Sequence, residues 1–438
     1  METDKTTLHD LSIFNHEEEF SVFDKLNFTR TTGGREKLRQ IFNKSLSDID
    51  SIKNVQKTLQ VILANKDQWP LVVSNGTVMM IYKFYESSID EPPSRPTPIT
   101  AYLYKLLHGP DFSLIKYSTG HAFDFIKGMQ QIVTVFLSDD TPLNLKKVLQ
   151  KAQVLIERHQ FHSISKFQKA SDLSNHQMLA FAYYIRYHYK QNFLELVDIY
   201  SQLDAWYGMA VAVNELKLSF PVFISSEEPV LKAKELYHIL LHEPVAYDVE
   251  LNQNHNFIFL TGANMAGKST FIKAVGSAVF LAHIGLGVPA DSMELSLFDG
   301  LLSNINVVDN IVKGESYFYN EVQRIKNTIL KVNDGRKWLV LIDELFKGTN
   351  VQDAMKCSSV VVKGLIKITS SLFILSTHLY EIGEELNTYP NISFKYFETA
   401  VLEDQLEFSY QIKDGISNDR IGYVILKREK VVEMLEKL

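Results

Sequence analysis

The hydrophobic positions in the first half of the chain repeat with the period of an α-helix. One amphipathic run carries apolar residues at close to helical spacing, at Ile49, Ile52, Val55, Leu59, Val61 and Ile62. A second, longer run has the same spacing and stops before Pro221; it comprises Phe193, Leu196, Val197, Tyr200, Leu203, Tyr207, Ala210 and Val211. The pattern predicts a mainly helical domain over residues 1–220.

A proline-rich stretch interrupts this helical pattern. The sequence SSIDEPPSRPTPIT, residues 87–100, holds Pro92, Pro93, Pro96 and Pro98. Proline fixes φ and removes a backbone donor, so we expect an extended, exposed loop here.

The pattern changes after Pro221, where short apolar runs alternate with helical segments. The runs are FIFL at 257, WLVLI at 338, SLFIL at 371 and ISFKYF at 392. Strands that alternate with helices favour an α/β domain with a largely parallel sheet. The predicted fold class is therefore α+α/β, with helices over 1–220, an α/β domain over 221–438, and a boundary between residues 215 and 235.

Composition narrows the possible environments and partners. The formal charge of −7 leaves no overall basic footprint, so any contact with nucleic acid would depend on local patches. Cys357 is the single cysteine, which excludes an intramolecular disulfide and fits a small apolar filler on a helix. The first residues do not resemble a signal peptide, and the longest apolar stretch, 274–290, is too short to span a bilayer. We expect a cytoplasmic protein with no membrane partner.

The stretch TGANMAGKST, residues 261–270, follows the apolar run at 257 and precedes an apolar helical segment. It fits the phosphate-loop pattern through Gly262, Gly267, Lys268 and Ser269, where glycines turn backbone N–H groups inward and a helix N-terminus faces the anion. A chance match in a simple strand-to-helix turn is the alternative, and the flanking strand and helix argue against it. The expected nucleotide-binding residues are Gly262, Ala263, Asn264, Met265, Ala266, Gly267, Lys268, Ser269 and Thr270.

An acidic pair supplies the second half of a nucleotide site. The apolar run WLVLI is followed by Asp343 and Glu344, and we expect Asp343 with Ser269 to hold Mg²⁺ and Glu344 to polarise the attacking water. His378 ends the next apolar strand and can hydrogen-bond a γ-phosphate. A buried strand that simply ends in solvated acids, and a structural histidine, are the alternatives. We predict Glu344, His378 and Lys268 as the catalytic residues of an ATPase that uses ATP and Mg²⁺.

Together these segments resemble the MutS family of DNA mismatch repair ATPases. TGANMAGKST is similar to the family's TGPNMGGKST, and LVLIDELFKGTN, residues 339–350, is similar to LVLMDEIGRGTS. Three shorter stretches also resemble family motifs: the VPA strip from Val288, KGESYFYNEV at 313–322 and STHLYE at 376–381. Weaker likeness extends upstream through LNFTRTTGGREKLRQIF from Leu26 and DIYSQLDAWYGMAVAVNELKLSFP from Asp198.

The resemblance implies an ABC-class P-loop ATPase domain behind a helical core, working as a homodimer on double-stranded DNA. It implies that Ser316 contacts the nucleotide bound by the other subunit, although a simple N-cap role is the alternative for this serine. No segment matches the family's mismatch-reading and connector domains, so we expect a reduced MutS-like protein in which mismatch recognition is open. Ala266 and Phe346 stand where the family has glycine, and we expect Phe346 to narrow the cleft and slow turnover.

DNA contact residues are harder to identify. Positive clusters occur at Arg30, Arg35, Lys37 and Arg39 and at Lys146, Lys147 and Lys151, but solvated helix faces have the same pattern. Two other functions therefore stay open: an ATP-switched interaction protein without DNA handling, and the motor subunit of an ABC transporter, against which the missing LSGGQ-like signature argues. Tyr247 is a candidate for stacking on adenine.

Overall fold

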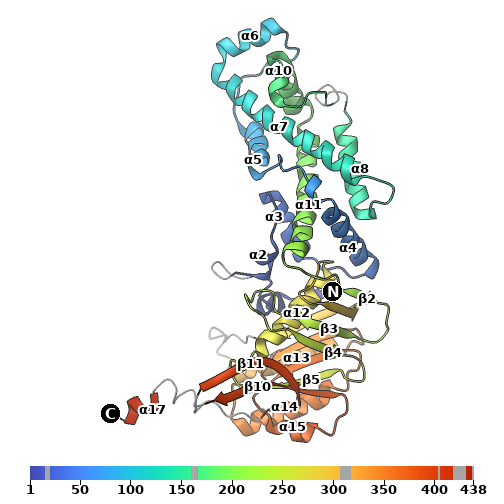
Figure 1. Ribbon diagram of the computed structural model, residues 1–438, viewed down its shortest axis with the longest axis vertical. Coiled ribbons are helices and arrows are strands. Elements are labelled where there is room, and N and C mark those ends of the chain that lie inside the picture. The colour runs from blue at the N-terminus through green and yellow to red at the C-terminus, as the bar shows by residue number, and fades with distance from the viewer. Residues whose placement is uncertain are drawn as a thin grey trace. The chain divides into compact units, whose positions relative to one another are not determined.

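The computed structural model describes residues 1–14, 20–158, 161, 166–305, 317–402, 405–417 and 431–436. The chain forms two compact units (Figure 1). The first, called the sheet unit below, contains residues 1–25, 45–52 and 216–438, and the second, the helical unit, contains residues 26–44 and 53–215. The helical run expected at 193–211 lies within one long helix, and the strands expected at 257, 338, 371 and 392 are all present.

The helical unit is built from α-helices and short turns of other helix types. Its elements, with α4 starting before the unit's own boundary, are α3 (Thr32–Phe42), α4 (Ile49–Ala64), η1 (Lys66–Gln68), α5 (Asn75–Glu86), α6 (Pro98–Leu107), α7 (Gly109–Phe136), α8 (Leu143–Ile156), η2 (Ala170–Asp172), α10 (Asn175–Tyr183), the π-helical η3 (Tyr184–His188) and α11 (Lys190–Glu215). Aromatic rings fill its core, with Phe125 lying 5.6 Å from Phe193 and 5.7 Å from Tyr200 between ring centroids.

Side-chain caps begin several of these helices. Ser74 starts α5 and Thr97 starts α6, each in a capping box with the threonine three positions later. Pro98 occupies the first turn of α6, where its missing N–H costs nothing. The proline-rich loop expected over 87–100 was therefore wrong at its last three residues, which are helical.

A buried carboxylate joins two segments of the helical unit that are distant in sequence. Asp204 on α11 is fully buried and accepts hydrogen bonds from the backbone N–H groups of Arg30 and Thr31 and from the Thr31 hydroxyl, at 2.7–3.0 Å for the shortest contacts. A Cβ on Gly34 would lie 2.0 Å from the Asp204 Oδ2, so this position has room only for glycine. Burial raises the pKa of Asp204, and the hydrogen bonds from Thr31 and Arg30 offset part of that rise.

Both sheets found among the described residues lie in the sheet unit. Its elements are β1 (Glu2–Thr3), α1 (Lys5–Asp10), α2 (Val22–Leu26), β2 (Val222–Ile224), β3 (Leu231–Leu236), β4 (Tyr247–Leu251), β5 (Phe257–Thr261), α12 (Lys268–His283), β6 (Ser292–Ser296), β7 (Gly300–Asn304), α13 (Tyr317–Val332), β8 (Trp338–Asp343), α14 (Val351–Leu365), β9 (Leu372–Ser376), α15 (Glu381–Leu386), β10 (Ile392–Leu402), β11 (Gln405–Asp414) and α17 (Val431–Glu436).

The larger sheet is mostly parallel, as the sequence predicts. Seven strands lie in the order β1-β7-β8-β9-β5-β10-β11, and every neighbouring pair is parallel except β10 with β11. A separate four-stranded sheet has the order β2-β6-β3-β4. Because β5, β8 and β9 are adjacent and parallel, the residues that follow their carboxyl ends meet at one edge of the sheet.

Helices cover both faces of the central strands, which explains why these strands are apolar along their whole length. Phe257 and Phe259 of β5 pack in one core with side chains from α13, α14 and α15. Leu341 of β8 faces the opposite way, towards Gly276 of α12, where an added Cβ would lie 2.6 Å from its side chain. The central strands therefore hold the ends of β5, β8 and β9 rigidly between two helical layers.

The first fourteen residues complete the sheet unit. Strand β1 pairs in parallel with β7, with Glu2 opposite Gly300. Fully buried Asp10 accepts hydrogen bonds from the Ser303 hydroxyl at 2.6 Å and the Ile305 N–H at 3.0 Å, and its carboxylate lies 3.7 Å from the Arg324 guanidinium. The helical pattern of the first half gives no signal that this segment belongs with the sheet.

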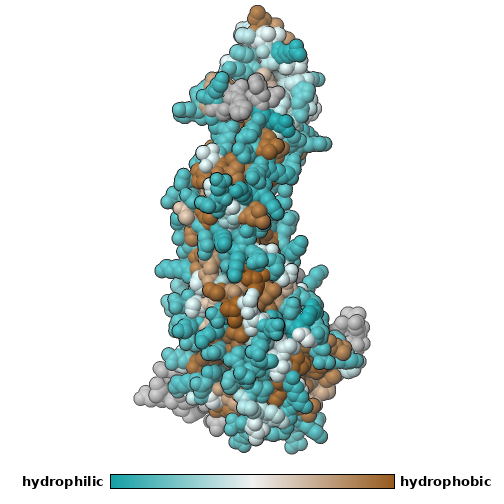
Figure 2. Space-filling view, turned by 90° about the vertical axis from the view of Figure 1, so that its right-hand side faces the viewer, coloured by the Kyte–Doolittle hydropathy of each residue, from teal (hydrophilic) through white to brown (hydrophobic). Residues whose placement is uncertain are grey.

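Among the residues that the structure describes, no helix combines the length and the apolar character needed to cross a membrane. The face drawn in Figure 2 is largely hydrophilic, with hydrophobic side chains scattered over it.

Candidate functional site: a nucleotide cleft

The loop after β5 has the backbone conformation of a phosphate-binding loop. Gly262 and Gly267 have φ values of 138° and 110°, and Met265 has a φ of 68°. These left-handed conformations turn the chain sharply, and Gly267 directly precedes the first turn of α12. The first N–H groups of α12 therefore face the loop, where an anion would be stabilised. Ala266 is outside the left-handed region, so its replacement of a glycine introduces no backbone strain.

Lys268 lies inside this loop. Its Nζ donates hydrogen bonds to the carbonyl oxygens of Gly262 at 2.7 Å and Ala263 at 2.8 Å, and lies 3.5 Å from the His378 Nε2. Burial lowers the pKa of Lys268 to about 8, although the nearby Glu344 and Asp343 carboxylates act to raise it. The ammonium group is thus held at the centre of the loop by backbone oxygens.

Asp343 and Ser269 bring two oxygen ligands together from different elements. The Ser269 hydroxyl donates to Asp343 Oδ2 at 2.5 Å, and the Ser376 hydroxyl donates to Asp343 Oδ1. The three residues come from the start of α12 and the ends of β8 and β9. A carboxylate beside a hydroxyl is the ligand type that Mg²⁺ prefers, so the donor set fits this ion.

The Glu344 carboxylate contacts two basic side chains. Its Oε1 lies 2.6 Å from His378 Nε2, and its Oε2 lies 2.9 Å from the Lys347 ammonium. Burial acts to raise the pKa of Glu344, but the hydrogen bonds from His378 and Lys347 outweigh it and lower the pKa to about 2. Glu344 is consequently a carboxylate at any physiological pH.

The loop after Glu344 is attached to the start of α13. The buried Glu321 carboxylate accepts the N–H groups of Lys347 at 3.0 Å and Gly348 at 3.2 Å. Phe346 has a left-handed φ of 60°, and its buried ring lies 5.7 Å from that of Phe318. Because the ring turns into this core and does not line the cleft, the expectation that Phe346 narrows the cleft was wrong.

These groups surround one cavity of about 530 Å³. Its lining includes Leu241, Glu243, Val245, Tyr247, Asn264, Met265, Gly267, Lys268, Ser269, Thr270, Asp343, Glu344 and Tyr410. Gly262, Ala263 and Ala266 are not part of this lining, although the first two bind the Lys268 ammonium through their carbonyl oxygens; His378 reaches the site through its contacts with Glu344 and Lys268. The structure therefore gathers the expected loop residues, Asp343, Glu344 and His378 at one place. Ser316 lies outside the described residues.

Two tyrosines line this cavity in different ways. Tyr247 is buried and meets the rings of Phe271 and Phe397 edge-on, at centroid distances of 5.5 and 5.7 Å. Tyr410 on β11 is exposed and has a left-handed φ of 52°. The alternation of Leu406, Phe408, Tyr410 and Ile412 with polar residues is the strand signal that would have pointed to it.

The positive clusters considered for DNA are partly neutralised. Lys37 lies 2.8 Å from Asp198, Lys151 lies 2.5 Å from Glu195, and Lys146 lies 4.0 Å from Asp139. Ion-paired lysines on helix surfaces are ordinary solvated features. Their pairing gives no support to a phosphate contact at these residues.

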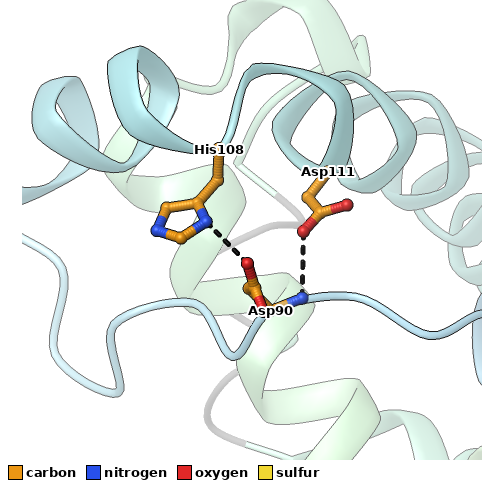
Figure 3. Close-up of side chains that lie close together, drawn as sticks. All are labelled: Asp90, His108 and Asp111. Atoms are coloured by element: carbon orange, nitrogen blue, oxygen red, sulfur yellow. Dashed lines mark hydrogen bonds and ion pairs between the residues drawn. The ribbon is translucent and has the colours of Figure 1, made fainter.

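A second group of potential ligands lies in the helical unit (Figure 3). Asp90, His108 and Asp111 have ligand atoms within 4.8 Å of one another. His108 Nδ1 lies 2.8 Å from Asp90 Oδ2, and the Asp90 N–H donates to Asp111 Oδ2 at 3.0 Å. The three side chains thus fasten the proline-rich loop to the junction of α6 and α7, and we assign them a structural role.

Part of the sheet unit is similar to a known family. Residues 258–435 match the family model MutS domain V. The chain is 27% identical over 230 residues to the DNA mismatch repair protein MutS of Petrotoga mobilis and 29% identical over 231 residues to that of Pseudothermotoga lettingae. It is 29% identical over 235 residues to the DNA mismatch repair protein spellchecker 1 of Drosophila melanogaster. These matches cover 52% of this chain but only 28%, 28% and 25% of the respective relatives.

Proposed function

We propose that this chain is a Mg²⁺-dependent ATPase of the MutS type, because residues 258–435 match the family model MutS domain V. The observation that carries the proposal is the meeting of Lys268, the Ser269–Asp343 pair and the Glu344–His378 pair around one cavity. A cavity of about 530 Å³ suits a nucleotide-sized ligand.

The phosphates of ATP would bind in the loop after β5. Its inward N–H groups and the N-terminus of α12 stabilise negative charge, and the Lys268 ammonium exchanges its contacts with the Gly262 and Ala263 carbonyl oxygens for phosphate oxygens. The side chains of Asn264, Met265 and Thr270 border the same space. Binding energy is thus concentrated on the triphosphate.

Asp343 and Ser269 would hold Mg²⁺, which when bound neutralises charge that develops on the phosphates. The Ser376 hydroxyl orients the Asp343 carboxylate from the end of β9.

Glu344 would orient the attacking water as a hydrogen-bond acceptor. A pKa of about 2 makes it a poor proton acceptor while His378 and Lys347 both bind it. When His378 or Lys347 turns towards the γ-phosphate, it no longer binds Glu344, and the proton affinity of Glu344 rises. His378 is suited to this exchange because it already lies 3.5 Å from Lys268 in the loop.

The base of ATP would stack on Tyr410 in preference to Tyr247. Tyr410 is exposed at the cavity, whereas the ring of Tyr247 is already packed edge-on against Phe271 and Phe397. By family likeness, Ser316 of a second subunit would complete the γ-phosphate contacts, and ATP would then join a homodimer that acts on double-stranded DNA in mismatch repair or a related process.

Glu344→Gln tests the ATPase proposal. Glutamine keeps the size of the side chain but removes the charge that orients water, so turnover should fall by about 10²–10⁴-fold while ATP still binds. Glu384→Gln, on the exposed surface of α15, is the matched control and should leave turnover unchanged. Steady-state phosphate release and ATP binding measured side by side decide the matter. Unchanged turnover in Glu344→Gln would refute the assignment.

A second candidate function is an ATP-switched interaction protein that does not handle DNA. The ion pairing of Lys37, Lys146 and Lys151 favours it, because these lysines are three of the seven positive residues that the sequence singled out. ATP turnover with and without duplex, mismatched and branched DNA separates the two candidates. Stimulation by DNA that weakens steeply with salt supports DNA handling.

A further inference from the structure

The beginning of helix α13 contacts the loop that follows β8, residues 344–350, called the β8 loop below. Phe318 and Glu321 lie three positions apart in α13 and therefore share one face of that helix. The Phe318 ring lies 5.7 Å from that of Phe346, and the Glu321 carboxylate binds the two residues that follow Phe346. One face of α13 thus contacts consecutive residues of the β8 loop.

Each oxygen of the Glu321 carboxylate binds one backbone N–H group of this loop. Oε1 accepts the Lys347 N–H at 3.0 Å, and Oε2 accepts the Gly348 N–H at 3.2 Å. Glu321 is only 4% exposed, so bulk water does not compete for these bonds. Hydrogen bonds to an ionised acceptor are stronger than neutral ones, and a buried donor that loses its acceptor is costly. Glu321 therefore fixes the backbone of the β8 loop at residues 347 and 348.

The backbone of the β8 loop depends on contacts of this kind. Glu344 and Phe346 have φ values of 62° and 60°, in the left-handed region that residues with a side chain rarely adopt. On one side of these two residues, the Glu344 N–H donates to the Ser376 carbonyl oxygen at 2.9 Å. On the other side, Glu321 binds the chain. The directions of the side chains at positions 344 and 347 are consequently set by groups outside the loop.

This attachment matters for the nucleotide cleft because of the Lys347 side chain. Its ammonium lies 2.9 Å from Glu344 Oε2, while His378 Nε2 lies 2.6 Å from Glu344 Oε1. The two partners differ in what else they contact. His378 is also 3.5 Å from the Lys268 ammonium in the phosphate loop, whereas Lys347 is bound through its backbone to Glu321. His378 is thus placed to exchange Glu344 for a phosphate, and Lys347 is placed to stay.

We propose that Glu321 is a positioning residue for the ATPase reaction. By fixing the backbone of Lys347, it keeps the Lys347 ammonium on Glu344 while His378 turns to the γ-phosphate. Glu344 then keeps the orientation that it needs to align the attacking water. Glu321 lies outside the lining of the cleft and acts through Lys347. This inference rests on the proposed function and extends it, because it names the partner that remains on Glu344 during turnover.

Glu321→Gln in the full chain tests the inference. Glutamine keeps the volume and one acceptor oxygen, so the chain should fold, but the β8 loop loses one of its two hydrogen bonds to α13. The kcat for ATP should fall about tenfold, and the Kd for Mg²⁺-ATP should change by less than about twofold. Glu384→Gln, on the exposed surface of α15, is the matched control and should leave kcat unchanged. Steady-state phosphate release and calorimetric titration give the two constants.

Lys347→Met tests the same connection without a change at Glu321. It removes the ammonium group from Glu344, so kcat should again fall about tenfold with ATP binding intact. Lys326→Met, at an exposed position of α13, is its control. The chain with both Glu321→Gln and Lys347→Met should also lose about tenfold, and not a hundredfold, because the two substitutions break one connection. A purely structural Glu321 predicts losses that multiply.

The results that overturn the inference are distinct from those that overturn the proposed function. Full kcat in Glu321→Gln or in Lys347→Met overturns the inference, and so do multiplied losses in the double variant. Loss of the fold in Glu321→Gln, followed by thermal unfolding, would make Glu321 a structural residue. If Glu344→Gln is inactive in these cases, the proposed function stands. A wild-type chain that releases no phosphate from Mg²⁺-ATP overturns both.

Discussion

Carboxylate groups serve different roles at two sites in this protein. In the sheet unit, Asp343 and Glu344 border a cavity and are bound by side chains: Ser269, Ser376, His378 and Lys347. In the helical unit, Asp204 is enclosed and is bound mainly by the backbone of residues 30 and 31.

The difference teaches how to separate a candidate reactive site from a structural one. Side-chain partners can rotate away and be replaced by a ligand, whereas backbone N–H groups in a folded turn cannot. A buried acid that borders open space and is held by rotatable partners is suited to chemistry; a buried acid that caps backbone donors is suited to stability.

The largest effect should come from Asp204→Ala. It leaves the Arg30 and Thr31 N–H groups and the Thr31 hydroxyl without their acceptor, so the free energy of unfolding of the helical unit should fall by about 3 kcal/mol. Urea unfolding followed by circular dichroism measures this loss. Asp198→Asn, which removes an exposed partner of Lys37, should change stability by less than ~0.5 kcal/mol. Equal losses of stability from the two substitutions would mean that the backbone N–H groups bound by Asp204 contribute no more than an exposed ion pair.

Lys268→Met should affect binding and spare the fold. Methionine fills the same volume without the ammonium group, so the affinity for Mg²⁺-ATP should fall on the order of 100-fold, about 2.7 kcal/mol. Calorimetric titration gives the affinity, and thermal unfolding should change little because a desolvated charge has been removed. A matched replacement at an exposed lysine, Lys147→Met, serves as the control. Loss of the fold in Lys268→Met would place this lysine with Asp204 as a structural group.

The pKa of Lys268 predicts a smaller, pH-dependent effect. Burial lowers this pKa to about 8 from an ordinary 10.5, so in the free protein the amine loses its proton above pH 8. The affinity for ATP should therefore fall by about fivefold between pH 8 and pH 9, and binding at pH 9 should take up a proton. Glu344 stays ionised over this range because its pKa is about 2.

The stability of the fold should rise with pH above pH 8, where the affinity for ATP falls. The unfolded chain keeps the proton on Lys268 up to pH 10.5 while the folded chain has released it, so this residue's contribution to the free energy of unfolding rises between pH 8 and 10.5.

Titration calorimetry in two buffers of different ionisation enthalpy detects the proton uptake that accompanies ATP binding. The uptake should vanish in Lys268→Met; if it persists there, another group titrates.

Asp10→Asn should have the smallest effect. Asparagine keeps an oxygen that can accept from Ser303 and Ile305 but loses the charge opposite Arg324, so the sheet unit should lose about 1 kcal/mol. Chemical denaturation with a probe in the sheet unit measures it. A loss as large as that of Asp204→Ala would mean that the charge on Asp10, and not its oxygen, holds the first fourteen residues in place.

Local patterns predicted much of the sheet unit. Four apolar runs identified β5, β8, β9 and β10, and the first three of these strands are apolar along their length because they are buried on both faces. The motif spacing identified the loop from Gly262 to Lys268 and the pair Asp343 and Glu344, since strand ends that share an edge of a parallel sheet meet in space. These signals depend on residues that are close in sequence.

Features that depend on distant contacts escaped prediction. The likeness to family motifs suggested that Phe346 lies in the cleft, but its orientation is set by Phe318 on α13. Pro98 was placed in a loop because proline usually disrupts helices, yet the Thr97 cap makes it the first residue of α6. Asp10 carries no periodic signal at all, because its partners Ser303 and Ile305 are almost three hundred positions away.

The pairing of β1 with β7 has a practical consequence for work on fragments. A piece cut at residue 216, where α11 has just ended, would lack β1 and α1 and would leave the outer edge of β7 open to other chains. It would also uncover the apolar surface that Leu11 fills beside Gly276. Such a fragment should aggregate on expression, and joining residues 1–14 back to it by a flexible tether should restore a folded, monodisperse sheet unit.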